Sequence, residues 1–282
     1  MSIFDEDKID CHNHILDPRR FPYAADTAYR PSGQEMGTRM QHEAVMDAYG
    51  IRHALIVEPN SGYGPDNRCL LDAIAQSQGR FKGMAVVANN CSTEQLQVLK
   101  DQGIVGIAFN PSLLGLDYYA DALPLMRRLA ALDMLVQVQV HQDQMCALAP
   151  MLLDSGAQLL VDHCGRPDST QAPSQSGFAA VLALARCGRA TVKLSGLQKF
   201  CDGGWPFAAA RPFVQALLDA YGPEHCVWAS DWPFLKASER LDMGPLLRWF
   251  EQLLPDARAR RQVFWHTPCR LLGFEAGAMV PA

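Results

Sequence analysis

The sequence lacks several features that would assign it to a familiar class of protein. Its nine cysteines include no CxxC pair, and no apolar run approaches the roughly 18 residues that suggest a membrane span. Basic residues are not in excess, because 25 Lys and Arg stand against 30 Asp and Glu, for a net charge of -5. These absences argue against a disulfide scaffold, a membrane protein and a dedicated nucleic-acid binder.

A secretion signal is also missing from the amino-terminal segment, Met1 to Lys8, which is acidic. We therefore expect a cytoplasmic protein with free thiols. With 49% hydrophobic residues the chain can bury a core, and its 282 residues suit either two ordinary domains or one large barrel. The oligomeric state stays open between monomer and dimer.

Short apolar segments alternate with amphipathic ones along the chain. Eight of the apolar segments are rich in Val, Ile and Leu and are closed by Gly, Pro, Asn or Asp, as expected of strands buried on both faces. They are Lys8–His12, His53–Pro59, Gly83–Val87, Gly103–Asn110, Met134–His141, Ala157–His163, Ala190–Gly196 and Cys226–Trp232. This count predicts one (β/α)8 TIM-type barrel domain over residues 1–282. A doubly wound sheet is the alternative, but the glycine fingerprint it often carries is missing.

Helical patterns lie between the predicted strands. Thr38–Tyr49 is followed by Gly50, which suits a helix end, and Ser92 with Gln95 forms a capping-box pattern. Further helices are predicted over Trp205–Tyr221 and Leu246–Leu254. The longest irregular stretches, Ile15–Gly37 and Arg166–Ser176, follow strands, so a barrel would place both at its carboxyl-terminal face.

Titratable residues gather where the predicted strands end: His12 and His14 at the first, His141 at the fifth, His163 at the sixth and Asp231 at the eighth. A single histidine is usually structural, but burying several imidazoles and a carboxylate together costs several kcal/mol unless they pair or bind something. The cluster therefore indicates an active site for a small molecule at one mouth of the barrel.

Alternation of side chains along a strand refines this expectation. It places His12 and His14 on the same side, and it places Gln137, Gln139 and His141 together on one face of the fifth strand. The same argument turns Cys11 and Cys164 away from the site, so we do not expect a nucleophilic thiol.

These motifs resemble the amidohydrolase superfamily. The resemblance rests on Asp10-Cys11-His12-Asn13-His14, on the run from Asp162 to Asp168 and on Ser230-Asp231-Trp232-Pro233. Within the superfamily, Ala28-Tyr29-Arg30-Pro31 and Gly64-Pro65-Asp66-Asn67 are most similar to the lactonase branch of the 2-pyrone-4,6-dicarboxylate lactonases. The resemblance implies a distorted (β/α)8 barrel and the hydrolysis of a lactone. It also implies that Asp231 is the general base, that His12, His14 and His163 polarise the carbonyl, and that Tyr29 contacts the substrate.

A requirement for a metal ion distinguishes most of the superfamily from this lactonase branch. Most of the superfamily binds a divalent ion, whereas the resemblance to the lactonase branch favours a reaction without a cofactor. One Zn²⁺ or Mn²⁺ on His12, His14, His141 and Asp231 is the alternative, and it would suit a metal-dependent decarboxylase or hydrolase.

The substrate is expected to be less acidic than a pyrone dicarboxylate. Ala108 stands where those lactonases carry an arginine, which leaves Lys199 to hold at most one carboxylate. Asn60, Ser61, Gln139 and His141 could meet hydroxyl groups. A sugar-acid lactone or an aromatic ring-cleavage lactone fits, and isomerisation of a sugar lactone is a further alternative.

Overall fold

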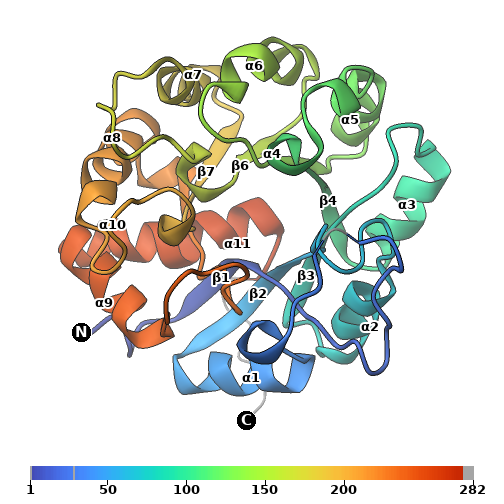
Figure 1. Ribbon diagram of the computed structural model, residues 1–282, viewed down its shortest axis with the longest axis horizontal. Coiled ribbons are helices and arrows are strands. Elements are labelled where there is room, and N and C mark those ends of the chain that lie inside the picture. The colour runs from blue at the N-terminus through green and yellow to red at the C-terminus, as the bar shows by residue number, and fades with distance from the viewer. Residues whose placement is uncertain (1, 28, 276–282) are drawn as a thin grey trace.

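The computed structural model describes residues 2–27 and 29–275 and contains a parallel sheet of eight strands in sequence order (Figure 1). The strands are β1 (Lys8–Asn13), β2 (Ile51–Val57), β3 (Phe81–Ala85), β4 (Ile104–Phe109), β5 (Leu135–Val138), β6 (Leu159–Val161), β7 (Ala190–Leu194) and β8 (Cys226–Trp228). All eight predicted strands are confirmed, although several end earlier than predicted.

Backbone contacts beyond β8 close the sheet into a barrel. The amide of Asp231 donates to the carbonyl of His12 at 2.8 Å, and the amide of His14 donates to the carbonyl of Trp232 at 2.9 Å. A parallel bridge also joins Asn13 to Trp232. The first and last strands are thus tied together at their carboxyl ends, and the predicted (β/α)8 barrel is confirmed.

Helices surround the barrel in Figure 1. They are α1 (Arg39–Ala48), α2 (Arg68–Gln76), α3 (Thr93–Asp101), α4 (Pro111–Leu114), α5 (Leu123–Ala131), α6 (Gln144–Asp154), α7 (Ser176–Leu184), α8 (Arg211–Tyr221), α9 (Met243–Leu253), α10 (Ala257–Arg261) and α11 (Thr267–Leu272). None of the helices in the described part of the chain has the length and apolar character that a membrane span requires.

Most helix boundaries follow the sequence signals. Thr38 and Ser92 cap α1 and α3, each in a capping box with the glutamine three residues later. The prediction for Trp205–Tyr221 was wrong at its start, because α8 begins only at Arg211. Phe207 has a left-handed φ of 53°, which no α-helix accommodates.

Apolar side chains fill two layers of the barrel. One layer lies between the sheet and the helices and includes Ile56, Val136 and Leu159. The second includes Leu55 and Leu160 on the other face of the strands, together with residues of α11. Because strands β5 and β6 end at Val138 and Val161, the polar residues that follow them lie at the mouth of the barrel.

Candidate active site

The backbone around the polar cluster is held in an uncommon conformation. His163 and Asp231 have φ values of 50° and 65°, in the left-handed region that residues other than glycine seldom adopt. Both residues directly follow a barrel strand or its short extension. The surrounding closed sheet fixes these conformations, and they turn the two side chains toward the carboxyl end of β1.

Three histidine rings converge on one oxygen of Asp231. The Nε2 atoms of His12, His14 and His163 each lie 3.8 Å from Asp231 Oδ1. The Asp231 side chain is fully buried, and its Oδ1 has no hydrogen-bond partner among the described residues. A buried carboxylate oxygen without a partner is costly and needs an explanation, so this oxygen is a candidate for contact with a reactant.

The other oxygen of the same carboxylate is well occupied. Lys199 Nζ lies 2.9 Å from Asp231 Oδ2, and Gln198 Nε2 donates to the same atom at 2.7 Å. These two contacts fix the carboxylate in place while leaving Oδ1 toward the histidines. Lys199 is therefore engaged with Asp231, although the sequence suggested that it would hold a substrate carboxylate.

The rings of His14 and His163 are each oriented by a residue at the end of a neighbouring strand. His14 Nδ1 lies 2.8 Å from the carbonyl oxygen of Val57, and His163 Nδ1 lies 3.0 Å from Ser195 Oγ. Gly196 makes the second position possible, because a Cβ at this residue would lie 2.4 Å from His163 Nδ1. The rings thus present their Nε2 atoms to Asp231.

A fully buried polar network supports His12 from inside the barrel. Lys193 on β7 lies 2.9 Å from Asp162 Oδ1, 2.7 Å from Gln137 Oε1 and 3.0 Å from His12 Nδ1. Gln137 Nε2 in turn donates to Asp162 Oδ2 at 2.9 Å, and His12 Nδ1 lies 3.3 Å from Asp162 Oδ1. Gln137 therefore points into the barrel, as predicted from the alternation of side chains along β5.

Burial determines the charge of the histidine rings. Desolvation lowers the pKa of His12 and of His163 well below the ordinary value, and nearby cationic side chains lower both further. Desolvation also lowers the pKa of His14, against the opposing effect of Asp231. The three rings are therefore neutral at pH 7, and each carries one N–H donor and one lone-pair acceptor.

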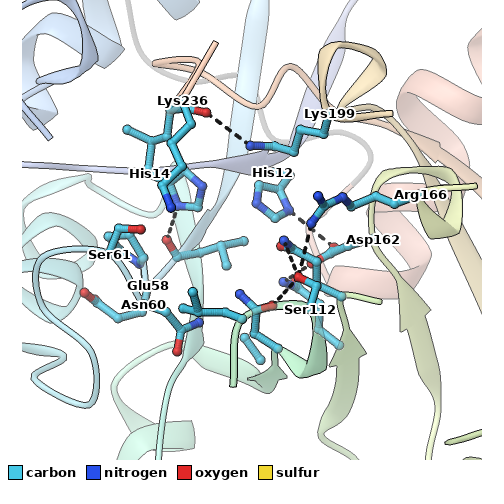
Figure 2. Close-up of a pocket in the computed structure, with 18 of the residues that line it drawn as sticks. His12, His14, Glu58, Asn60, Ser61, Ser112, Asp162, Arg166, Lys199 and Lys236 are labelled. Atoms are coloured by element: carbon cyan, nitrogen blue, oxygen red, sulfur yellow. Dashed lines mark hydrogen bonds and ion pairs between the residues drawn. The ribbon is translucent and has the colours of Figure 1, made fainter. Parts of the chain in front are cut away.

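A cavity of about 360 Å³ opens beside His12 and His14. Figure 2 shows these two rings with Lys199 and Arg166 on one side and with Asn60 and Ser61 on the other. The lining is largely polar, with Asn110, Ser112, Gln139 and Gln198 among its neutral members, and it includes the cations Arg166, Lys199 and Lys236. A cavity of this size and polarity suits a small oxygenated ligand.

Two predicted substrate contacts lie outside this cavity lining. Tyr29 donates a hydrogen bond to Glu35, and Lys236 stands over its ring. His141 lies against a separate cavity beside Arg166, because β5 ends at Val138 and the alternation of side chains does not continue to residue 141. Ala28 of the motif that contains Tyr29 lies outside the described residues.

Sequence reasoning overlooked several residues of the site, among them Lys193, Arg166 and Gln198. Lys193 is the single charged residue of the fully buried strand β7. Because Val192 and Leu194 face the helices, side-chain alternation would have predicted that Lys193 points into the barrel. Arg166 lines the cavity and donates to Ser112 Oγ at 3.1 Å. Asp168 orders the loop that follows, through hydrogen bonds from Thr170 and Gln171.

The cysteines near the site remain protonated. Cys11 and Cys164 are fully buried, and desolvation raises the pKa of Cys164 to about 12 and that of Cys11 well above its ordinary value. Neither thiol is therefore a nucleophile at neutral pH.

The same cluster also has the donors of a metal site. His12, His14 and Asp231 each offer one ligand atom, and these atoms lie within 4.8 Å of one another. The free Oδ1 of Asp231 suits a cation, and imidazole with carboxylate is a donor set that Zn²⁺ accepts. His141, the fourth ligand in the alternative set, does not join this group among the described residues.

Comparison with known proteins relates the whole barrel to lactone hydrolases. A family model described as Amidohydrolase matches residues 9–274. The chain is 28% identical over 272 residues to 4-sulfomuconolactone hydrolase of Hydrogenophaga intermedia, covering 94% of this chain and 88% of that protein. It is 26% identical over 291 residues to L-fucono-1,5-lactonase of Burkholderia ambifaria, covering 93% and 94% of the two chains.

Solved structures give the same result for the fold. A probable 2-pyrone-4,6-dicarboxylic acid hydrolase of Acinetobacter baumannii, with citric acid bound, has a TM-score of 0.85 at 25% identity and covers 95% of this chain and 99% of its own. A Burkholderia multivorans amidohydrolase with bound zinc has a TM-score of 0.75 at 19% identity, covering 96% of this chain and 100% of its own. Similar barrels thus include one with a bound metal ion.

Proposed function

Because the chain belongs to the Amidohydrolase family, we propose that it hydrolyses a small lactone, with Asp231 as general base. The observation that carries the proposal is the unpartnered Oδ1 of this buried carboxylate, which faces three neutral histidine rings at 3.8 Å. A base beside several potential donors is the arrangement that addition of water to a carbonyl requires.

The reaction divides into an addition and an elimination. Asp231 Oδ1 takes a proton from water as the water oxygen bonds to the lactone carbonyl carbon, and the carbonyl electrons move onto its oxygen. His12 and His163 can stabilise this oxyanion with an N–H donor, and one such donor contributes about 3–4 kcal/mol. The ring C–O bond then breaks, and the proton held by Asp231 passes to the leaving oxygen. The product is an open-chain hydroxy acid, which ionises at neutral pH.

Lys199 and Gln198 have a supporting part in these steps. Their contacts of 2.9 Å and 2.7 Å hold Oδ2 of Asp231, so that the carboxylate presents Oδ1 in one orientation. A fixed base avoids the cost of reorganisation during proton transfer. Lys199 therefore acts on the base, and Arg166 in the cavity wall is the better candidate for an anionic substituent of the substrate.

The cavity favours a hydroxylated lactone with at most one anionic group. Ala108 lines the wall where the pyrone dicarboxylate lactonases carry an arginine, and Lys199 is already paired with Asp231. Of the other cations in the lining, Lys236 stands over the Tyr29 ring, which leaves Arg166 for one anionic group. Neutral hydrogen-bonding groups, including Asn60, Ser61 and Gln139, make up the largest share of the rest. A sugar-acid lactone matches these partners better than a pyrone dicarboxylate, which needs two cationic sites.

The reaction is proposed to proceed without a metal ion. Should a divalent ion bind, His12, His14 and Asp231 are the residues that would hold it, and it would polarise the carbonyl and lower the pKa of bound water. Asp162 and Ser195 would still orient the rings of His12 and His163.

A lactone panel in a pH-stat tests the proposal, because each hydrolysis releases one proton. The panel compares L-fucono-1,5-lactone and a D-galactaric acid monolactone with 2-pyrone-4,6-dicarboxylate and muconolactone, after subtraction of spontaneous hydrolysis. We expect the sugar lactones to be turned over with the highest kcat/KM. Efficient turnover of the pyrone dicarboxylate with inert sugar lactones would contradict the substrate class, and inertness of every lactone would contradict hydrolysis itself. Conversion without acid release would identify an isomerase.

A further inference from the structure

We infer that Lys193 is a positioning residue that holds His12 in the tautomer with its proton on Nε2, opposite to the tautomer of His14. The two histidines would then have different tasks at the same carbonyl. The inference deepens the proposed function and rests on it for its mechanistic meaning, whereas the tautomers themselves can be measured without any substrate.

The tautomer of His14 follows from its single partner. Its Nδ1 lies 2.8 Å from the carbonyl oxygen of Val57, and a carbonyl oxygen can only accept a hydrogen bond. A neutral ring in this contact carries its proton on Nδ1. The Nε2 atom of His14 consequently carries a lone pair and no proton. It faces Asp231 Oδ1, which is also an acceptor. Only a donor or a cation can bridge two such atoms, and a water molecule about to react is a suitable donor.

The tautomer of His12 follows from the three protons of the Lys193 ammonium group. Three acceptors lie within hydrogen-bond distance of Nζ: Gln137 Oε1 at 2.7 Å, Asp162 Oδ1 at 2.9 Å and His12 Nδ1 at 3.0 Å. Each proton therefore has one acceptor, provided that His12 Nδ1 is a lone pair. All four residues are buried to 1% exposure or less, so an unmatched proton would have no water to bond.

The amide of Gln137 supports the same assignment. Its Oε1 accepts from Lys193, so its Nε2 donates, and the acceptor of that bond is Asp162 Oδ2 at 2.9 Å. Asp162 thus accepts from Lys193 on one oxygen and from Gln137 on the other. Every polar atom of the network is satisfied in a single pattern, and the two opposite charges lie in direct contact.

The opposite tautomer of His12 would break this pattern. A proton on His12 Nδ1 would point toward a donor-only ammonium group at 3.0 Å, unless Lys193 were a neutral amine. A neutral amine would leave the Asp162 carboxylate buried without its counter-charge, and an unpaired buried charge costs several kcal/mol. The shorter distance from His12 Nδ1 is to Lys193, at 3.0 Å, compared with 3.3 Å to Asp162.

The pair of tautomers divides the work at the carbonyl. His12 presents an N–H toward Asp231 and the cavity, which makes it a donor to the developing oxyanion. His14 presents a lone pair, which can accept a hydrogen bond from the second O–H of the attacking water while Asp231 takes the first proton. A metal ion would require a lone pair on His12 Nε2, so the same tautomer also opposes metal binding at this ring.

Long-range ¹H–¹⁵N correlation spectra of uniformly ¹⁵N-labelled protein at pH 7 measure both tautomers directly. Single substitutions of His12 and His14 by Gln assign the ring signals. We expect protonation at Nε2 for His12 and at Nδ1 for His14. A proton on Nδ1 of His12 would overturn the inference, and this readout on the unaltered protein does not depend on the folding of any variant.

Lys193→Met tests the role of the lysine. We expect the His12 proton to move to Nδ1, where Asp162 can accept it, while the His14 signals stay unchanged as the internal control. On whichever lactone the panel identifies, kcat should fall by about 10²-fold with KM nearly unchanged, since one oxyanion donor is lost. A His12 tautomer that survives Lys193→Met would overturn the role of Lys193. If the tautomers are as inferred but no lactone is hydrolysed, the proposed function fails and the assignment of Lys193 stands.

Discussion

Lys199 Nζ lies 2.9 Å from Oδ2 of Asp231, and not from the oxygen that faces the histidines. The lysine side chain keeps 18% of its surface exposed, whereas the aspartate side chain is fully buried. The contact thus joins the cavity wall to the buried base. Lys199 therefore orients the carboxylate of Asp231, and an anionic group of the substrate would have to bind another cationic side chain.

Replacement of Lys199 separates these two assignments. In Lys199→Met the carboxylate of Asp231 keeps only Gln198 as a partner on Oδ2, so we expect kcat to fall by about 10–10²-fold with a small change in KM. Lys100→Met on α3 removes the same charge outside the cavity and serves as control. A rise in KM with kcat unchanged would show that Lys199 binds substrate instead.

Substitution of Gly196 should displace His163. Gly196→Ala would place a Cβ 2.4 Å from His163 Nδ1, so the ring must move away from Asp231. We expect kcat/KM to fall by at least about 10²-fold, because a misplaced catalytic group loses most of its contribution. Gly156→Ala is the matched control, since its φ of 73° resembles the 62° of Gly196 but its Cβ would meet nothing within 4 Å. Equal losses in both variants would assign the effect to backbone strain alone.

His42 should make the stability of the fold sensitive to acid. Its ring is fully buried against Trp232, neither nitrogen has a partner among the described residues, and desolvation lowers its pKa to about 3. The unfolded chain protonates this ring near pH 6.5, so the stabilisation is complete above that pH and is lost as the pH falls toward 3.

Urea unfolding at pH 7 and pH 5 measures this dependence. The free energy of unfolding of the natural chain should drop by about 2 kcal/mol more than that of His42→Leu, at about 1.4 kcal/mol per pH unit below the unfolded pKa. His266→Gln at an exposed position should leave the dependence unchanged. Equal pH slopes for His42→Leu and the natural chain would contradict the burial of a neutral ring.

Chelation tests the absence of a metal requirement. Protein treated with dipicolinate and then freed of it should retain its lactone turnover within about twofold, because the proposed base acts on water directly. Elemental analysis should find less than one equivalent of zinc or manganese. A stoichiometric ion, with activity lost on its removal and restored on its return, would favour the metal-dependent alternative on His12, His14 and Asp231.

The sequence predicted the barrel and the meeting of four site residues. Periodicity located all eight strands, and parallel strands of a barrel bring their carboxyl ends to one mouth. His12, His14, His163 and Asp231 each follow or end such a strand, so their convergence required only the fold.

The remaining contacts of the site involve loops and turns, whose side-chain directions cannot be predicted from the alternation of side chains along a strand. β5 ends at Val138, so the extrapolation to His141 ran three residues past the end of the strand. Tyr29 lies in a long loop whose path no local pattern determines. The pairing of Lys199 with Asp231 depends on a short 3₁₀ turn after β7, Leu197–Lys199. The direction of the Lys193 side chain was predictable from alternation along β7. Its partners were not, because they come from β1, from β5 and from the residue that follows β6.

The most direct test of the mechanism is the turnover of Asp231→Asn on the best lactone of the panel. The substitution keeps the size of the side chain but removes the base, so we predict that kcat falls by at least about 10³-fold while the circular dichroism spectrum and KM stay close to those of the natural chain. Asp154→Asn, on the surface of α6, should retain full activity. Lactone hydrolysis by Asp231→Asn at a rate within tenfold of the natural chain would contradict the assignment of Asp231 as the base.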